Sequence, residues 1–385
     1  MLNIRLQRTP SEFIMDFENS VQMLQEMLEI YSPSGKEREM ALYLKDKLVE
    51  VGFESVRTDD AGNVYGEVGS GSPSILLCGH MDTVVGLIPV KRKDNWLYGR
   101  GSVDAKSSLA AMIIASSNLK SNIKDGRLIV ASVVEEERSS KGIRQLLREN
   151  INVDYAIFGE PSGLNNITFA YKGRVTTRIK CQTVSGHVGA SHLLDNAIEK
   201  TFELWNNIKV ECKKEGEDKE FFSIITPCLV GIHSRRTCGG VPDVCLIDID
   251  LRLPPSVNTE AGIKIIKKAI EKFRIYNSKT SIAFLVIDKV EPFVAEKGTI
   301  LMKALGRAIV ETTGGTFRFL KKTGTGDMNI FGSEVKVPVA TYGPGDSRLS
   351  HTKKERINLT EFQASIQVYQ KAIKHLITWH KQVEE

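Results

Sequence analysis

Three short apolar runs constrain the fold of this chain more than any other feature. They read SILLC at residues 74–78, LIVASVV at 128–134 and YAIF at 155–158. Helical patterns lie between them, over residues 106–119 and after Gly142. Short strands that alternate with helices are typical of an α/β domain with a largely parallel sheet. We therefore predict an α/β fold in which helices flank a mostly parallel mixed sheet.

The middle of the chain follows a different pattern. Residues 174–184 and 244–253 form long alternating strands, with helical segments near 194–213 and 259–275 and a strand at 282–288. This combination predicts an inserted α+β domain, ferredoxin-like, in which helices cover one face of an antiparallel sheet. The helix-rich α/β pattern returns from Gly298 and ends in a helix from about Thr360. We expect a discontinuous first domain at residues 1–172 and 289–385, with the insert at 173–288, which suits a chain of 385 residues.

Composition excludes several classes of protein. No apolar run approaches the roughly 18 residues of a membrane span, and the first residues do not resemble a secretory signal. A cytoplasmic location is therefore expected. The formal charge is +5, with basic and acidic residues interleaved, which argues against nucleic-acid binding and permits an anionic substrate or an acidic partner. The six cysteines form no CxxC pair, so we expect reduced thiols and no thiolate metal site.

Residues that bind metals follow each of the three apolar runs. Sites in open α/β sheets form at the carboxyl ends of strands, so these side chains are expected to converge. A further acid stands just before the helix at 106–119, and a second imidazole comes from a loop near the end of the chain. The set comprises His80, Asp82, Asp104, Glu135, Glu136, Glu137, Glu160 and His351.

Imidazole and carboxylate donors without thiolates suit a catalytic zinc site, and a shared carboxylate holds two ions about 3.5–4 Å apart. Asp104 is the candidate for that bridge. Asp82 lies two residues beyond His80, on the same face of an extended segment, so it can orient the imidazole without binding metal. In the triplet at 135–137 one carboxylate must stay free as a base while a neighbour binds an ion. Spacing leaves open which one does so.

Six motifs together resemble a known family: CGHMDTV, GRGSVDAK, EEERSSKG, FGEPSG, SGHVGAS and GTGDMNIFG. In this order, from about residue 20 to the C-terminus, they look like the zinc aminoacylase/carboxypeptidase-type metallohydrolases. That family includes acetylornithine deacetylases, succinyl-diaminopimelate desuccinylases and aminotripeptidases. The resemblance implies a metal-dependent hydrolase of linear amide bonds with two Zn²⁺ per chain, for which Co²⁺ can substitute.

The resemblance also assigns roles at the metal centre. It implies that His80, Asp104 and Glu160 hold one zinc and that Asp104, Glu137 and His351 hold the other. Glu136 is then the general base. Glu135 departs from the aspartate that the family often has, at a position that is not a ligand.

The insert resembles the family's lid, which implies a homodimer formed through it. His187 of SGHVGAS matches a histidine that stabilises the oxyanion, with His192 as a nearby rival. Arg252 matches a position that binds a substrate carboxylate, although it could simply be a strand residue paired with a neighbouring acid. Gly326 lies in a loop, residues 324–329, that matches a substrate-side loop.

The wording of the motifs is most similar to the LysW-carrier lysine/ornithine hydrolases. These enzymes of lysine and arginine biosynthesis release lysine or ornithine from the C-terminal glutamate of a small acidic carrier protein. An N-acetylornithine or N-acetyl-lysine deacetylase is the alternative, followed by a di- or tripeptidase. A non-catalytic binding homologue is disfavoured because no ligand is missing. Residues 1–15 have no counterpart in the resemblance.

Overall fold

The structure is a computed structural model that describes residues 15–121, 123, 125–214, 220–235 and 238–384. The chain divides into two compact units. The first contains Met1–Phe169, Ala295–Leu320 and Glu334–Glu385, and the second contains Ala170–Val294 and Lys321–Ser333. The sequence patterns had placed residues 170–172, 289–294 and 321–333 in the discontinuous first domain.

A mixed sheet has the order β1-β2-β6-β3-β7-β15-β8, with β13 and β14 also paired with β8, and most of its strands belong to the first unit. Parallel pairs join β3 to β6, β3 to β7 and β7 to β15, whereas β1 and β2 add antiparallel strands at one edge. The strands are β1 (Glu54–Thr58), β2 (Val64–Ser70), β3 (Ser74–His80), β6 (Gly126–Val133), β7 (Tyr155–Gly159), β8 (Asn166–Tyr171), β13 (Phe293–Val294), β14 (Arg318–Lys322) and β15 (Val339–Tyr342).

A small three-stranded sheet accompanies this central sheet. Its order is β16-β5-β4, and its strands are β4 (Lys91–Lys93), β5 (Trp96–Tyr98) and β16 (Arg356–Asn358). It therefore joins a segment from the first hundred residues to the loop that precedes the last helix.

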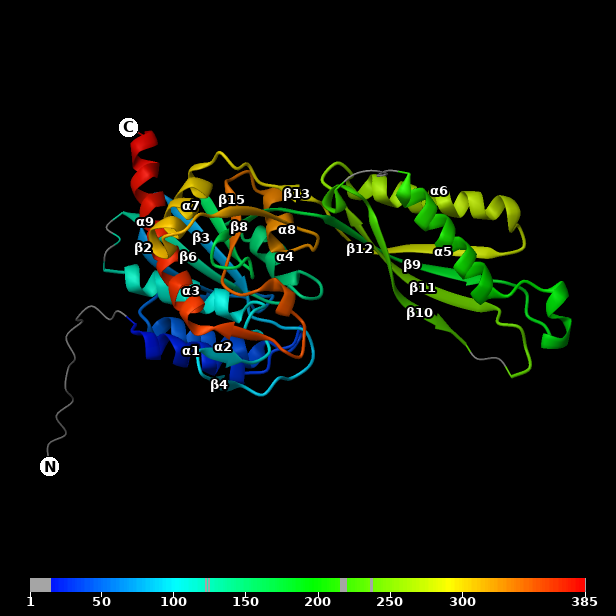
Figure 1. Cartoon of the computed structure of the whole chain (residues 1–385), viewed down its shortest axis with the longest axis horizontal. Helices are drawn as coiled ribbons and strands as arrows, with labels where there is room; N and C mark the ends of the chain where they lie inside the picture. Colours follow the sequence, from blue (N-terminus) through cyan, green and yellow to red (C-terminus); the bar gives the residue numbers. More distant parts are fainter. Residues whose placement is uncertain (1–14, 122, 124, 215–219, 236–237, 385) are drawn as a thin grey trace, which may run out of the picture. The chain divides into compact units, whose positions relative to one another are not determined.

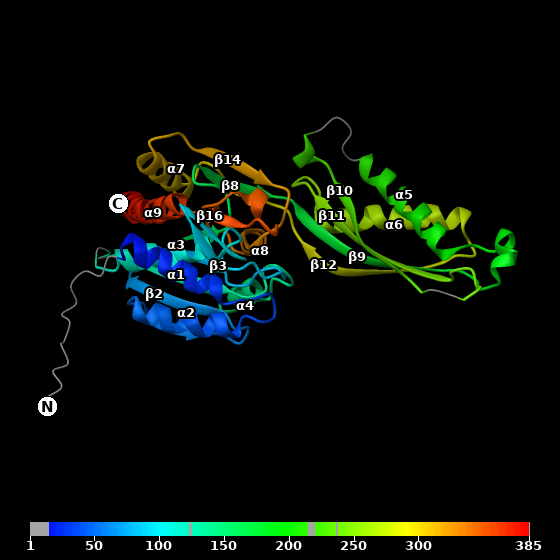
Figure 2. The ribbon, with the colours of Figure 1, turned by 60° about the horizontal axis from the view of Figure 1, so that its bottom comes forward.

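Helices cover the central sheet of the first unit. The helix α3 is buried on nearly all sides and packs against β3, β6, β7, α1 and α9, and α9 in turn packs against α7 (Figures 1 and 2). Its one charged residue, Lys106, stands at its first position, so the helix has no charged face that needs solvent. The helices are α1 (Phe17–Glu29), α2 (Arg38–Glu50), α3 (Lys106–Leu119), α4 (Lys141–Arg148), α7 (Ile300–Thr313) and α9 (Leu359–Glu384).

The second unit has a four-stranded antiparallel sheet in the order β10-β11-β9-β12. Its elements are β9 (Gly173–Gln182), α5 (Ala197–Lys213), β10 (Thr226–Ser234), β11 (Val244–Leu253), α6 (Thr259–Tyr276), β12 (Ser281–Val290) and the short α8 (Asp327–Glu334). Alternate residues of β9 and β11 pack with α5 and α6 into one apolar core. The βαββαβ order is ferredoxin-like. The predicted fold class is confirmed.

The strand order places the ends of three parallel strands beside one another. The strands β6, β3 and β7 are neighbours and run in the same direction. They end at Val133, His80 and Gly159, so the polar residues that follow them gather at one edge of the sheet. Within the described residues, no helix combines the length and the apolar character needed to cross a bilayer.

Candidate metal centre

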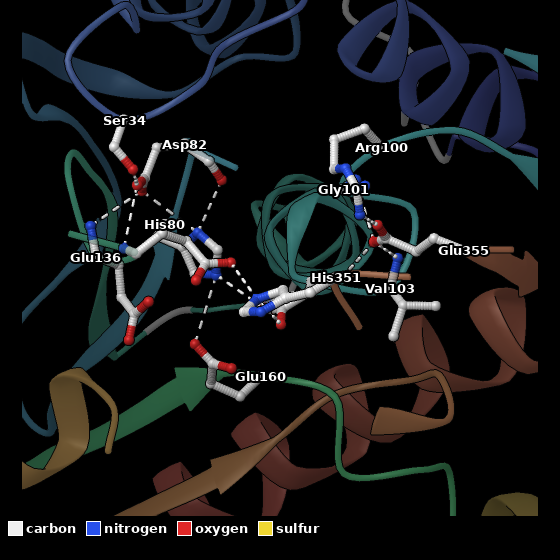
Figure 3. Close-up of polar contacts among 12 residues, drawn as sticks. Ser34, His80, Asp82, Arg100, Gly101, Val103, Glu136, Glu160, His351 and Glu355 are labelled. Atoms are coloured by element: carbon white, nitrogen blue, oxygen red, sulfur yellow. Dashed lines mark hydrogen bonds and ion pairs between the residues drawn. The ribbon is translucent and has the colours of Figure 1, made fainter. Parts of the chain in front are cut away.

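His80, the last residue of β3, is almost completely buried, and its ring is held by polar contacts on both sides. Nδ1 donates to the backbone oxygen of Asp82 at 2.9 Å. Nε2 lies 3.3 Å from Oδ1 of Asp104 and 3.5 Å from Oε1 of Glu160 (Figure 3). Because Nδ1 is occupied as a donor, Nε2 is the nitrogen that can offer a lone pair to a metal ion.

Asp104 directs its two carboxylate oxygens toward different histidines. Oδ1 faces His80, and Oδ2 lies 3.2 Å from Nε2 of His351. His351 is also 2.8 Å from Oε1 of Glu137. Asp104 lies two residues before the start of α3, where the helix dipole favours negative charge. One carboxylate thus belongs to two donor groups, which is the arrangement that two neighbouring ions require.

The loop after β6 presents the glutamate triplet, and Asp82 holds its backbone. Asp82 accepts from the amide of Glu136 at 3.0 Å through Oδ1 and from the amide of Glu137 at 3.1 Å through Oδ2. Its Oδ1 is also 3.4 Å from Nδ1 of His80. The orienting contact expected between Asp82 and His80 is therefore present, and the same carboxylate additionally fixes the loop of the triplet. Its role in activity stays a prediction.

Two residues of the site have left-handed backbone conformations that favour glycine. Glu135 has a φ of 53° and His351 a φ of 63°. Each such residue costs about 1–2 kcal/mol, so the surrounding contacts must compensate. For Glu135 these include its amide, which donates to Oε1 of Glu37 at 3.1 Å. Strain of this kind at a ligand loop is typical of functional sites.

The charges of the site need a cation. Burial would raise the pKa of Asp104, but hydrogen bonds from His351 and His80 hold this pKa well below its usual range. The contacts with Asp104 and Glu137 raise the pKa of His351 to about 10. Burial opposes protonation of His80, yet Asp104 and Asp82 raise its pKa well above the usual value. Without a metal ion these contacts favour the protonated imidazoles, and a bound metal ion would balance the acids in place of those protons.

Two sets of donors have the chemistry and spacing of metal sites. In each set the ligand atoms lie within 4.8 Å of one another: His80, Asp104 and Glu160 in one, and Asp104, Glu137 and His351 in the other. A third set combines His80 with Glu136 and Glu137. Nitrogen and carboxylate donors suit zinc. The residues present therefore fit metal binding, and Glu136 lies beside both sets.

His187 belongs to the second unit, where its ring caps a short helix. It is exposed, and Nδ1 accepts from the amide of Gly189 at 3.0 Å. This bond fixes the neutral tautomer with the proton on Nε2, which makes the ring a potential hydrogen-bond donor. His192 is also exposed. The predicted action of His187 at the metal centre stays a prediction.

Arg252 and Gly326 also lie in the second unit. The guanidinium of Arg252 pairs with Asp250, at 2.7 Å from Nε and 3.3 Å from Nη2, and lies 3.5 Å from Oγ1 of Thr325. The strand pair that the sequence left open as an alternative is therefore present. Gly326 donates its amide to Oδ1 of Asn329 at 3.0 Å, so it forms part of a fixed turn. Substrate binding by either residue remains to be tested.

Sequence reasoning missed the side chains that support the ligands. Ser34 donates to Oδ2 of Asp82 at 2.7 Å, and the buried Glu37 accepts from the amides of Gly35 and Glu135. Both belong to the Ser-Pro-Ser-Gly turn or its continuation, which reads only as a break between two helices. No local pattern indicated that this turn lies against the metal centre.

Comparison with known proteins places this architecture in one family. The family model "Peptidase family M20/M25/M40" matches residues 76–375. The LysW-lysine hydrolase of Deinococcus radiodurans is 33% identical over 368 residues, which cover 94% of this chain and 98% of the relative. The LysW-lysine/LysW-ornithine hydrolase of Saccharolobus solfataricus is 30% identical over 367 residues, covering 94% and 97%.

Solved structures share the fold at lower identity. A tripeptidase from Staphylococcus aureus superposes with a TM-score of 0.81 at 19% identity, covering 95% of this chain and all of its own. An M20 family metallo-carboxypeptidase from Sulfolobus solfataricus has a TM-score of 0.79 at 16% identity, covering 93% and 99%. The extent of the family match and of the two hydrolase relatives shows that this chain is a hydrolase belonging to peptidase family M20/M25/M40.

Proposed function

We propose that this chain is a two-zinc amidohydrolase that releases lysine or ornithine from the C-terminal glutamate of a small acidic carrier protein. The observation that carries the reaction is the pair of donor sets that share Asp104, with Glu136 beside them. The names of the two relatives, LysW-lysine hydrolase and LysW-lysine/LysW-ornithine hydrolase, support the substrate. We place the reaction in the cytoplasm, with Co²⁺ as an alternative metal.

The candidate ligands divide into two sets, each of which would hold one ion. His80 and Glu160 would serve one ion, Glu137 and His351 would serve the other, and Asp104 would serve both. When bound, zinc lowers the pKa of water and polarises the amide carbonyl. His80 can direct Nε2 at an ion only while its ring is fixed. The hydrogen bond from Nδ1 to the backbone oxygen of Asp82 fixes the ring.

Glu136 moves the proton in the proposed mechanism. Its carboxylate takes a proton from the attacking water as the carbon–oxygen bond forms, and then delivers it to the amine as the carbon–nitrogen bond breaks. Its backbone amide is held by Asp82, which sets where the side chain begins. His187 donates from Nε2 to the oxyanion, either within one chain or across a dimer formed by the second units. Arg252 and Gly326 are proposed to contact the substrate.

A groove of the first unit suits an acidic protein partner. It has a volume of about 380 Å³ and lies between α2, the loop after Ser34 and the loop that carries Glu135. Lys36, Arg38 and Lys45 line it, and no ion pair involves these three in the part of the chain that the structure describes. The exposed Leu42 lies among them. One loop of the groove follows Ser34, which donates to Asp82, and the other carries Glu135, which directly precedes Glu136.

The proton transfer is tested by replacing one glutamate of the triplet at a time. Glu136→Gln is expected to lower kcat by about 10²–10⁴-fold, the usual contribution of a general base, with an unchanged metal content. Glu135→Gln is the matched control and should retain most activity, because Glu135 belongs to none of the donor sets. Metal analysis accompanies each assay. Hydrolysis by Glu136→Gln at the wild-type rate would refute this assignment.

The substrate is tested by comparing kcat/KM values of zinc- or cobalt-loaded enzyme. The candidates are the carrier adducts of lysine and ornithine, N-acetyl-lysine, N-acetylornithine, and di- and tripeptides. The carrier adducts should exceed the others. The double charge reversal Lys36→Glu/Arg38→Glu should raise KM for the adducts alone, whereas Lys91→Glu/Lys93→Glu on the exposed β4 should not. Equal kcat/KM values for acetylated amino acids and adducts would exclude the carrier as the specific substrate.

A further inference from the structure

Glu355 is a completely buried acid that binds the loop ending in Asp104. Its Oε2 accepts from Nη1 of Arg100 at 2.7 Å. Its Oε1 accepts from the backbone amides of Gly101 at 3.1 Å, Val103 at 3.0 Å and Asp104 at 3.0 Å (Figure 3). One carboxylate therefore accepts from three backbone amides of this loop and from a guanidinium.

These bonds fix the direction of the shared metal ligand. The amide of Asp104 is held directly, so the Cα–Cβ bond of Asp104 has little freedom to swing. Its two oxygens must face His80 and His351 at the same time, and a small rotation of the loop would lose one of them. A carboxylate that serves two ions demands more exact placement than one that serves a single ion.

The same interactions reach the loop of the second histidine. Arg100 donates from Nη1 to the backbone oxygen of Thr352 at 3.2 Å as well as to Glu355. Thr352 directly follows His351, which has a left-handed backbone conformation. Glu355 itself stands four residues beyond His351. Arg100 and Glu355 thus connect the loop of Asp104 with the loop of His351, although these segments are far apart in the sequence.

A purely structural role is the simpler alternative. Loss of stability alone does not separate the two roles, because removing one partner of a buried ion pair destabilises a protein whatever else the pair does. Groups that orient metal ligands have a larger effect on the metal itself. We propose that Glu355 is a positioning residue that holds Asp104 and His351 in the arrangement that binds two metal ions. This inference rests on the proposed two-metal function.

The test measures metal affinity separately from catalysis. Metal-free protein is titrated with Zn²⁺ by calorimetry, and Co²⁺-loaded protein is followed by visible absorption, which reports ligand geometry. In Glu355→Gln one oxygen can still accept the loop amides, but the new amide group faces the guanidinium of Arg100. We expect metal affinity to fall by about 10–100-fold, with a changed Co²⁺ spectrum, a lower kcat and a nearly unchanged KM.

Glu67→Gln is the matched control. It also removes one carboxylate from an Arg–Glu pair of the first unit, the pair with Arg127 at 2.8 and 2.7 Å. Glu67 pairs across the sheet with Ile129, in the half of β6 away from the triplet loop. This variant should keep the metal affinity and the Co²⁺ spectrum of the wild type. The melting temperature of each metal-free variant shows how much of an effect is general destabilisation.

The outcomes separate the two roles of Glu355. Wild-type metal affinity and an unchanged Co²⁺ spectrum in Glu355→Gln would overturn the proposal, even if the melting temperature fell. Glu355→Asp, which keeps the charge but shortens its reach, decides the question by the same measurements if the glutamine variant does not fold. If the wild type binds two ions but cleaves no amide, the proposed function fails, and the affinity measurements still test the positioning role.

Discussion

Replacement of Asp82 by asparagine should loosen the loop of the general base by a calculable amount. The carboxylate accepts from the amides of Glu136 and Glu137 and from the hydroxyl of Ser34, which lies 2.7 Å away. Asparagine offers one acceptor oxygen, and its amide group must face one of the two backbone amides. Leaving such a donor unpaired costs about 1–3 kcal/mol.

The expected magnitude lies toward the lower end of that range because these bonds are partly accessible to solvent. An opening free energy lowered by about 1.4 kcal/mol corresponds to a tenfold change in the opening equilibrium. Hydrogen exchange of residues 134–140 in metal-free Asp82→Asn protein should therefore be about tenfold faster than in the wild type, as read by mass spectrometry of that peptide.

Ser34→Ala is the control for this variant. It removes one hydroxyl donor but leaves both backbone amides paired with Asp82, so the same peptide should exchange at close to the wild-type rate. Exchange in Asp82→Asn that stays within about twofold of the wild type would refute the reasoning, because the loop would then be held by other contacts.

Three further outcomes follow from the structure. Hydrogen bonds from Lys214 and Lys272 lower the pKa of Glu211 to about 2. The stability that the ionised Glu211 contributes is therefore present above its unfolded pKa near 4.5 and is lost as the pH falls toward 2. Glu211→Gln should lower the free energy of unfolding in urea by about 1 kcal/mol at pH 7, and this difference from the wild type should disappear in acid. Gly142→Ala would place its Cβ 2.5 Å from the carbonyl oxygen of Val134 and should cost about 1–3 kcal/mol, whereas Gly324→Ala meets nothing within 4 Å and should unfold at nearly the wild-type temperature. Removal of metal by a chelator should lower the melting temperature of the first unit by several degrees. Zn²⁺ at about 100 times its Kd should then raise the free energy of unfolding by about 2.7 kcal/mol. A calorimetric melting curve that Zn²⁺ leaves unchanged would contradict metal binding.

Local pattern was enough to predict most elements, because each depends on its own residues. The helical pattern over residues 106–119 forms α3, and the apolar run at 155–158 forms β7. Several of the candidate metal ligands were recognisable because they directly follow such strands, whose order in a parallel sheet brings their ends together. Chemistry at the end of a strand is thus encoded within a few residues.

Contacts between distant loops were not predictable in this way. Glu355 binds backbone amides near residue 101, and Ser34 binds the carboxylate of Asp82. Each partner is far away in the sequence, and neither residue belongs to a periodic apolar pattern. Similarly, residues 321–333 join the second unit through Asn329, which donates to the carbonyl oxygens of Lys172 and Glu291. A single buried amide can decide such an attachment, and composition carries no trace of it.

The wide separation of the two histidines along the chain has a consequence for synthesis on the ribosome. His80 emerges early, but its counterpart His351 and the helix α9 that covers α3 are made almost last. The long segment of the second unit, Ala170–Val294, is translated after the first segment of the first unit, and its roughly 125 residues take about 6–25 s at 5–20 residues per second. Throughout that interval the nascent chain carries an incomplete donor set, so amide hydrolysis begins only after translation has nearly finished.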